Sequence, residues 1–232
     1  MSVGGYHFVT GSFTSHRSFL PDKEYGVALD NFVKGCSDML IQNSKGQILT
    51  GKRNVHPQPD WWFVGGRMMP GESPGVSCSR LLKRELSLNI AADRFKPLCF
   101  NSMVWGMREQ EPKANGTCDV NIVLTVQLSE EEASQIVLDP KEYTDSKWVA
   151  PEEMLEGSYH PALQCSVRSL LSAAKLSALQ NAVGSGAEDR VVAALAKDLV
   201  GIAQTEPTLG ESSYRVKNEE LGYDGSVSVS KW

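Results

Sequence analysis

The pattern of apolar and polar residues along the middle of the chain alternates between strand and helix periods. Two β-rich runs, 38–42 and 47–51, flank an Asn-Ser-Lys-Gly turn and predict a hairpin. Residues 74–86 are amphipathic, with Ser73 as N-cap and Pro74 in the first turn, where a missing N–H costs nothing. Further strands are predicted at 61–64, 95–104, 119–127 and 146–150.

Helical patterns also occur towards both ends of the chain. A short helix is expected from Glu24, ending before Gly35, and its apolar positions are Val27, Leu29, Phe32 and Val33. From residue 204 onward the chain is polar with scattered Gly and Pro, which predicts a loosely held tail. The remaining helical segments are predicted at 128–137, 151–155, 160–183 and 188–203.

Strands on both sides of the helix at 74–86 predict an α/β sandwich. We divide the chain into an N-terminal flap or dimer segment (1–35), a main domain (36–175) and a helical C-terminal extension with a polar tail (176–232). At 232 residues, one domain of ordinary size plus an extension is the expected organisation.

The composition of the chain argues against nucleic-acid binding and against insertion into a membrane. A formal net charge of -5 gives no overall basic field, so nucleic acid is not an expected partner. No apolar run approaches the roughly 18 to 20 residues that span a bilayer, so a membrane is not expected either. The five cysteines are an odd number without metal-ligand spacing, which favours reduced thiols and a cytoplasmic location.

The stretch 65–88 carries the candidate chemistry. It opens with two glycines, places Glu72 in a loop, and continues as the predicted helix, which carries Glu85. We expect the two carboxylates to converge near the carbonyls of the glycine turn. Oxygen ligands of this kind suit a hard cation such as Mg²⁺, which usually keeps waters and substrate phosphates in its shell.

The spacing within this stretch resembles the signature of the Nudix hydrolase family. Two leucines of the stretch, Leu82 and Leu88, fill apolar positions of that signature. The glycine, arginine and acids that match it with correct spacing are Gly66, Glu72, Arg80 and Glu85. Three positions depart from it, namely Leu81, Arg84 and Ser87. The first two of them stand where the signature has helix acids.

Within the family the chain is most similar to GDP-mannose mannosyl hydrolases, which lack the same two acids. The likeness extends over residues 36–171 and is carried by the segments 38–67 and 128–155. It implies a Nudix-type α/β/α sandwich with a mixed sheet, a homodimer, and a nucleoside diphosphate sugar as substrate. One essential Mg²⁺ is expected, with Mn²⁺ as an alternative ion, and the products would be a nucleoside diphosphate and the free sugar.

The resemblance also assigns roles to individual residues. The metal ligands would be the Gly66 carbonyl and the carboxylates of Glu72, Glu85 and Glu142. The residues implied in catalysis are Arg67, Arg80, Glu142 and Asp38, and those implied in substrate binding are Arg53, Arg67 and Asp38. For Arg80 a second interpretation stays open, namely an arginine that ties Glu72 to the helix.

The general base is where the sequence departs from the mannosyl hydrolases. They carry a Gln-His pair in the closing loop, whereas this chain has Glu142 and Tyr143. A tyrosine is a poor base near neutral pH, because its ordinary pKa is about 10. Glu142 is therefore the alternative base. Two other functions stay open: a Nudix pyrophosphohydrolase that cleaves the P–O–P bond of a nucleotide derivative, and a nucleotide-binding Nudix domain without turnover.

Overall fold

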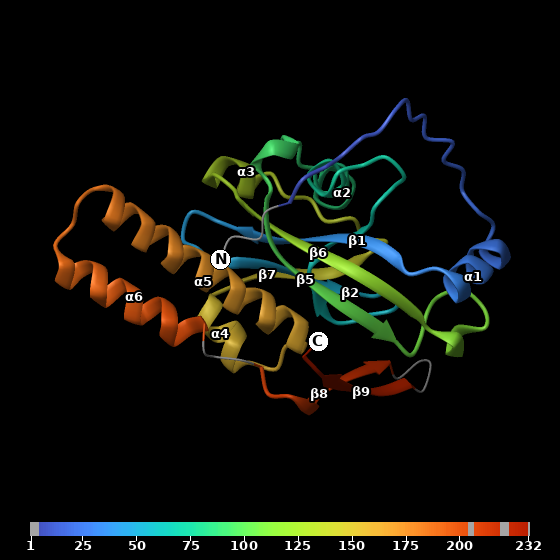
Figure 1. Cartoon of the computed structure of the whole chain (residues 1–232). Helices are drawn as coiled ribbons and strands as arrows, with labels where there is room; N and C mark the ends of the chain where they lie inside the picture. Colours follow the sequence, from blue (N-terminus) through green and yellow to red (C-terminus); the bar gives the residue numbers. More distant parts are fainter. Residues whose placement is uncertain (1–4, 204–206, 219–222, 232) are drawn as a thin grey trace.

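A computed structural model describes residues 5–203, 207–218 and 223–231 (Figure 1). Its main feature is a mixed sheet of seven strands in the order β3-β2-β1-β6-β5, with β4 added to β1 and β7 added to β2. The central strands β1 and β6 run parallel, and the other pairs are antiparallel. The strands are β1 Lys34–Gln42, β2 Ile48–Arg53, β3 Trp61–Trp62, β4 Val64–Arg67, β5 Lys96–Trp105, β6 Thr117–Gln127 and β7 Tyr143–Val149.

Helices cover both faces of this sheet, which confirms the predicted α/β/α sandwich (Figure 1). On one face α2 packs through Cys78, Leu82 and Leu86 against Met39 and Ile41 of β1. On the other face α5 packs against the core around Trp62 and Val123. The helices are α1 Asp22–Asn31, α2 Pro74–Leu86, α3 Glu130–Ser134, α4 Pro151–Glu156, α5 Pro161–Gly184 and α6 Asp189–Ala203, and 3₁₀ turns occur at Ala92–Arg94 and Lys113–Asn115.

The segment predicted as one strand at 61–64 is two strands. Trp61 and Trp62 pair with β2, whereas Val64 begins β4, which pairs with β1. Phe63 lies between them, fully buried in the core on the α5 side. The chain changes partner strand at this residue, and a continuous apolar run gives no sign of such a change.

The expected apolar face of the first helix is wrong. Leu29 is buried, but Val27, Phe32 and Val33 are more than half exposed, and α1 ends at Asn31 before the last two of them. The helix is attached to the domain by a polar contact instead. Asp30 accepts a hydrogen bond of 2.6 Å from the buried guanidinium of Arg108.

The end of the chain is not the loosely held tail that its composition predicts. Within the described residues, β8 Gly210–Asn218 and β9 Tyr223–Val229 form an antiparallel hairpin. Its Tyr214 is buried against the domain, where the hydroxyl donates to Asp60 Oδ2 at 2.7 Å and accepts from Gln58 Nε2 at 2.8 Å. The parts of the predicted tail at 204–206, 219–222 and 232 lie outside the described residues. No described helix is long and apolar enough to cross a membrane.

Candidate active site

Helix α2 starts where the sequence predicts, directly after the loop that contains Glu72. The hydroxyl of Ser73 accepts from the Val76 amide at 3.3 Å, as an N-cap does. Upstream, Gly65 lies against β1 so closely that a Cβ atom there would be 2.2 Å from Asp38 Oδ1 and 2.6 Å from the Asp38 Cα. Only glycine fits at this position, so the glycine turn and Asp38 are held side by side.

Glu85 is the buried acid of this region, with 1% of its surface exposed. Its Oε2 accepts from the Tyr143 hydroxyl at 2.5 Å and from the Gly65 amide at 3.3 Å. Its Oε1 accepts from Arg84 at 2.5 Å. Burial raises the pKa of Glu85, while the Tyr143 and Arg84 contacts oppose that rise. The helix acid therefore contacts the glycine turn through the Gly65 amide.

Leu81 shows why one signature acid can be absent without leaving a gap. Its side chain is fully buried in the core between α2 and the sheet. A carboxylate at position 81 would need a cation or a hydrogen-bond donor beside it, because burial of an unpaired charge costs much free energy. Leucine makes the helix face apolar and leaves Glu85 as the buried acid of α2.

Tyr143 is not placed to act as a base. The residue is 4% exposed, and burial followed by the neighbouring Glu85 charge raises the pKa of its phenol well above 10. Its ring lies under Gly51, where a Cβ would be 2.4 Å from the ring. Tyr143 acts instead as the hydrogen-bond donor that holds Glu85.

Asp38 is buried on β1, and its hydrogen-bond donor was not predicted from the sequence. The Asn121 amide of β6 donates to Asp38 Oδ2 at 2.6 Å. Burial raises the pKa of Asp38 to about 7, although the Asn121 bond and the Arg53 charge oppose the rise. Asn121 lies within the apolar run 119–127, and only the parallel pairing of β1 with β6 brings it to Asp38.

Arg53 and Glu142 form a pair at the end of β2. Arg53 Nη2 lies 3.3 Å from Glu142 Oε2, and both side chains are less than a third exposed. The buried Nε of Arg53 has no hydrogen-bond partner among the described residues. Arg53 also interacts electrostatically with Tyr143, Glu85 and Asp38. It is thus the cation that the buried acids of this site share.

Glu72 and Arg80 form a separate ion pair. Arg80 donates to Glu72 through Nε at 2.5 Å and through Nη2 at 2.8 Å, and the Met69 amide donates to the same carboxylate at 2.9 Å. Burial would raise the pKa of Glu72, but the Arg80 bonds lower it overall. Of the two interpretations of Arg80, this arrangement matches the one in which the arginine ties Glu72 to the helix.

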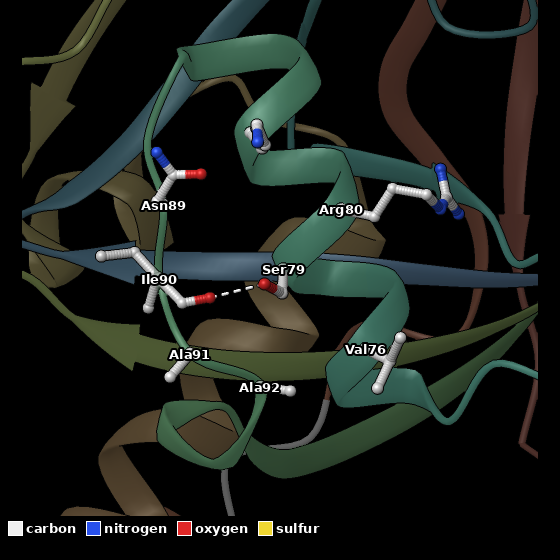
Figure 2. Close-up of a pocket in the computed structure, with 8 residues that line it drawn as sticks. Val76, Ser79, Arg80, Asn89, Ile90, Ala91 and Ala92 are labelled. Carbon is white, nitrogen blue, oxygen red and sulfur yellow. Dashed lines mark hydrogen bonds between the residues drawn. The ribbon is translucent and has the colours of Figure 1, made fainter.

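Figure 2 shows the outer side of α2, where Arg80 points away from the segment 89–92. This segment is fixed to the helix by a hydrogen bond of 2.5 Å from the Ser79 hydroxyl to the Ile90 carbonyl. The hollow between them has a volume of about 550 Å³. None of its described lining residues is an acid, so it offers no carboxylate ligand for a cation.

Arg67 is exposed at the end of β4, and its guanidinium lies over the ring of Tyr25 in α1 at 4.8 Å. A cation placed over an aromatic face in this way gains about 0.5–1 kcal/mol at an exposed site. Tyr25 was not among the predicted site residues. Its contact connects the N-terminal segment to the glycine turn.

The structure does not bring the predicted metal ligands together as one set. No group of three His, Cys, Asp or Glu side chains that could hold a metal ion occurs among the described residues. Glu72 is held by Arg80 and Glu142 by Arg53, and the expectation that both join Glu85 on one ion stays a prediction. Glu85 is the buried carboxylate beside the glycine turn, and carboxylate oxygens are ligands of the kind that Mg²⁺ prefers.

Arg84 is the cation that pairs with Glu85 in this structure. It stands where the signature has an acid, and its guanidinium is 2.5 Å from Glu85 Oε1. A Cβ at Gly66 would be 3.8 Å from the same guanidinium. The Arg84 side chain is 48% exposed, whereas that of Glu85 is 1% exposed, so the pair joins a partly solvated cation to a buried acid.

A glycine turn against a buried acid on the helix of an α/β/α sandwich defines a Nudix-type hydrolase site. The model of the NUDIX domain matches residues 36–170, more than half of the chain. The chain therefore belongs to the NUDIX domain family, whose hydrolases generally use divalent metals and act on nucleotide derivatives.

Solved structures of similar fold come from several organisms. The chain is 20% identical to a MutT NUDIX hydrolase from Burkholderia pseudomallei, covering 60% of this chain and 98% of that one, with a TM-score of 0.49. An Ap4A hydrolase from C. elegans is 18% identical, with 63% and 99% covered and a TM-score of 0.46. A MutT protein from Methanosarcina mazei Go1 is 19% identical, with 58% and 90% covered and a TM-score of 0.43.

Proposed function

We propose that this chain is a magnesium-dependent hydrolase of a nucleoside diphosphate sugar, GDP-mannose-like, that releases the nucleoside diphosphate and the free sugar. The observation that carries the proposal is the buried Glu85 carboxylate in contact with the glycine turn, while the neighbouring signature position holds the buried Leu81. A site with one helix acid suits one ion. One ion is sufficient where a whole diphosphate departs from carbon, because the negative charge then grows on the diphosphate, where the ion would neutralise it.

Within this proposal Glu85 and the Gly66 carbonyl would hold the Mg²⁺, and Mn²⁺ would substitute for it. The ion would supply positive charge to the departing diphosphate when it is bound. Arg67 and Arg53 would add guanidinium contacts to phosphate oxygens, which such groups bind in a forked geometry. Asp38, held by Asn121 and the glycine turn, would accept hydrogen bonds from the sugar hydroxyls.

Glu142 would take the proton of the attacking water. The water oxygen forms a bond to the anomeric carbon, the bond from that carbon to the diphosphate oxygen breaks, and the electron pair leaves with the diphosphate. Arg53, 3.3 Å from Glu142, orients the carboxylate. Tyr143 takes no part in the proton transfer, because its hydroxyl donates to Glu85.

The pairing of Glu142 with Arg53 also favours a second candidate function. If Arg53 binds a phosphate group, a base 3.3 Å from it would direct water towards phosphorus. The chain would then be a pyrophosphohydrolase that cleaves the P–O–P bond of a nucleotide derivative. The substrate class and the metal would stay the same, and only the attacked atom would differ.

Hydrolysis in ¹⁸O-labelled water separates the two reactions. Purified protein with Mg²⁺ is given a panel of nucleotide sugars, and the products are identified by mass. We expect the label in the free sugar, and label in the nucleotide phosphate would establish the second candidate. Glu85→Gln is expected to reduce turnover at least about a hundredfold, a loss typical of removing one key electrostatic group. Glu131→Gln on exposed α3 serves as the control, and a lack of turnover on every substrate would support a binding domain.

We also propose that the chain is a homodimer formed through its N-terminal segment. Exposed large apolar side chains gather in this segment, where Phe8, Phe19 and Phe32 are each more than 70% exposed. Large apolar side chains that stay exposed in one segment are candidates for burial in an interface. Light scattering after size exclusion should give twice the chain mass, and Phe19→Ser with Phe32→Ser should give the monomer mass. A monomer from the unchanged chain would refute the dimer.

A further inference from the structure

Residues of the edge strand β5, helix α5 and the β8–β9 hairpin line a large groove. Figure 1 shows where these elements lie in the fold. The volume of the groove is about 1400 Å³, which exceeds the roughly 300–1000 Å³ of typical small-molecule pockets. One wall is formed by residues along β5 and α5, and the other includes Val216 and residues 225–229 of the hairpin. The hairpin follows the part of the chain that matches the family, so the C-terminal extension creates this groove.

The groove differs in charge from the rest of the protein. The chain has 28 acidic residues and a net charge of -5, yet no Asp or Glu is among the described residues that line the groove. Arg168 and Lys231 both line it. A negatively charged ligand would therefore meet no carboxylate among the described residues that line the groove.

Two hydrogen-bond donors in the groove lack a partner. Asn101 Nδ2 on β5 and Arg168 Nη1 on α5 are both buried atoms without a hydrogen bond in the described structure. Leaving a buried donor unpaired costs about 1–3 kcal/mol, and more for a charged group. An acceptor oxygen on a bound ligand would remove this cost, and a negatively charged oxygen would remove most of it.

The remaining lining is mostly apolar or weakly polar. Trp105, Leu98 and Val216 are each less than a tenth exposed and contribute to the walls. The half-buried thiols of Cys99 and Cys165 add soft, weakly polar surface. Walls of this kind favour a ligand with an apolar body.

We propose that this groove binds an organic anion with an apolar body, whose charged oxygens meet Arg168 and Asn101. The site is separate from the acids of the hydrolase site, none of which lines the groove. Binding here consequently does not depend on whether the proposed hydrolysis is correct. An extended peptide strand added to the edge of β5 is the competing occupant.

Decanoate and decanol test the proposal, because they share an apolar chain and differ in charge. Calorimetric titration of the full chain should show decanoate binding with one site and decanol binding more weakly. Arg168→Gln should weaken decanoate binding about tenfold or more, as expected for a lost charged hydrogen bond, and should change decanol binding less than about twofold. Arg190→Gln, a matched change on an 83% exposed arginine of α6, should change neither.

A second variant guards against misfolding of the first. Ser228→Trp places a large side chain on the exposed hairpin wall of the groove and should reduce binding of both probes. The proposal is refuted if Arg168→Gln weakens both probes equally, if Ser228→Trp has no effect, or if neither probe binds. Binding of a ten-residue β-forming peptide that decanoate does not displace would establish the peptide strand as the occupant.

Discussion

At the residue scale, the site is organised by what each buried acid touches. Glu85 accepts hydrogen bonds from the Tyr143 hydroxyl, a backbone amide and the Arg84 guanidinium. Glu72 instead accepts two hydrogen bonds from the guanidinium of Arg80. An acid that already holds a bidentate arginine has few lone pairs left for a metal. Glu85, held partly by an exposed arginine, can exchange that cation for another.

Replacing Arg84 should therefore strengthen metal binding. In Arg84→Gln, Oε1 of Glu85 loses the cation that lies 2.5 Å away, and the site gains negative charge. We expect the affinity for Mn²⁺, measured by electron paramagnetic resonance, to rise about tenfold, which corresponds to about 1.4 kcal/mol. Arg94→Gln, which removes an arginine paired with Glu132 outside the site, is the control. An unchanged affinity would show that Glu85 is not a ligand.

His160 carries a prediction for the pH dependence of stability. It is buried among Trp62, Trp105 and Tyr214, its Nδ1 accepts from the Ala162 amide, and burial lowers its pKa to about 3. The unfolded chain, with a histidine pKa of about 6.5, binds a proton below that pH that the folded chain does not. The contribution of the neutral His160 to the free energy of unfolding is therefore fully present above pH 6.5. It is lost as the pH falls towards 3.

Urea unfolding at pH 7.5 and pH 5 measures this effect. We expect the histidine to account for about 2 kcal/mol of the stability lost between these pH values. His160→Gln should lack that part of the loss, while His16→Gln, at an exposed position, should keep it. Equal losses in all three proteins would mean that His160 is protonated in the folded state.

At the element scale, the sequence predicted those parts whose signals are local. The bounds of α2 follow from a serine N-cap, a proline in the first turn and an amphipathic run, all of which act within a few residues. The helical segment predicted at 128–137 is shorter in the structure, where α3 begins after the capping box of Ser129 and Glu132. The break between β3 and β4 and the parallel pairing of β1 with β6 depend on residues far apart, and no local pattern encodes them.

The C-terminal hairpin lies where the polar composition of the chain predicted a loosely held tail. Its strands are polar because one side is exposed, yet Tyr214 and Val216 are buried against the domain. Tyr214 holds the loop between β2 and β3 through Gln58 and Asp60. A single inward-facing tyrosine in a polar segment is too weak a signal to distinguish a docked hairpin from a tail.

Tyr214→Phe should loosen this loop without unfolding the domain. The variant keeps the ring contact with His160 but leaves Gln58 and Asp60 without the shared hydroxyl. We expect a loss of about 1–2 kcal/mol in the free energy of unfolding, because two hydrogen bonds are removed and Gln58 is fully buried. Tyr6→Phe, at an 84% exposed position, is the control for urea unfolding. A loss equal to that of the control would show that the hydroxyl does not bind the loop.

At the scale of the whole molecule, a family domain and its two extensions are joined by a few specific contacts. Asp30 with Arg108 attaches the N-terminal helix, and Tyr214 attaches the hairpin. The sequence predicted where the family domain lies because a signature and two flanking segments mark it. It could not predict how the extensions return to the domain, since the contacts that dock them join residues far apart in the sequence.

Ending the chain at residue 203 should accordingly destabilise the domain itself. Removing the hairpin withdraws the buried side chains of Tyr214 and Val216 and exposes the cluster around Trp105 and His160. Burial of one such side chain contributes about 1.5–3 kcal/mol, of which the ordering of the hairpin offsets a part. A net loss of about 2–3 kcal/mol lowers the unfolding temperature of a chain of this size by roughly 5–10 °C. Scanning calorimetry of the two chains measures this difference, and an unchanged unfolding temperature would mean that the extension rests on the domain without stabilising it.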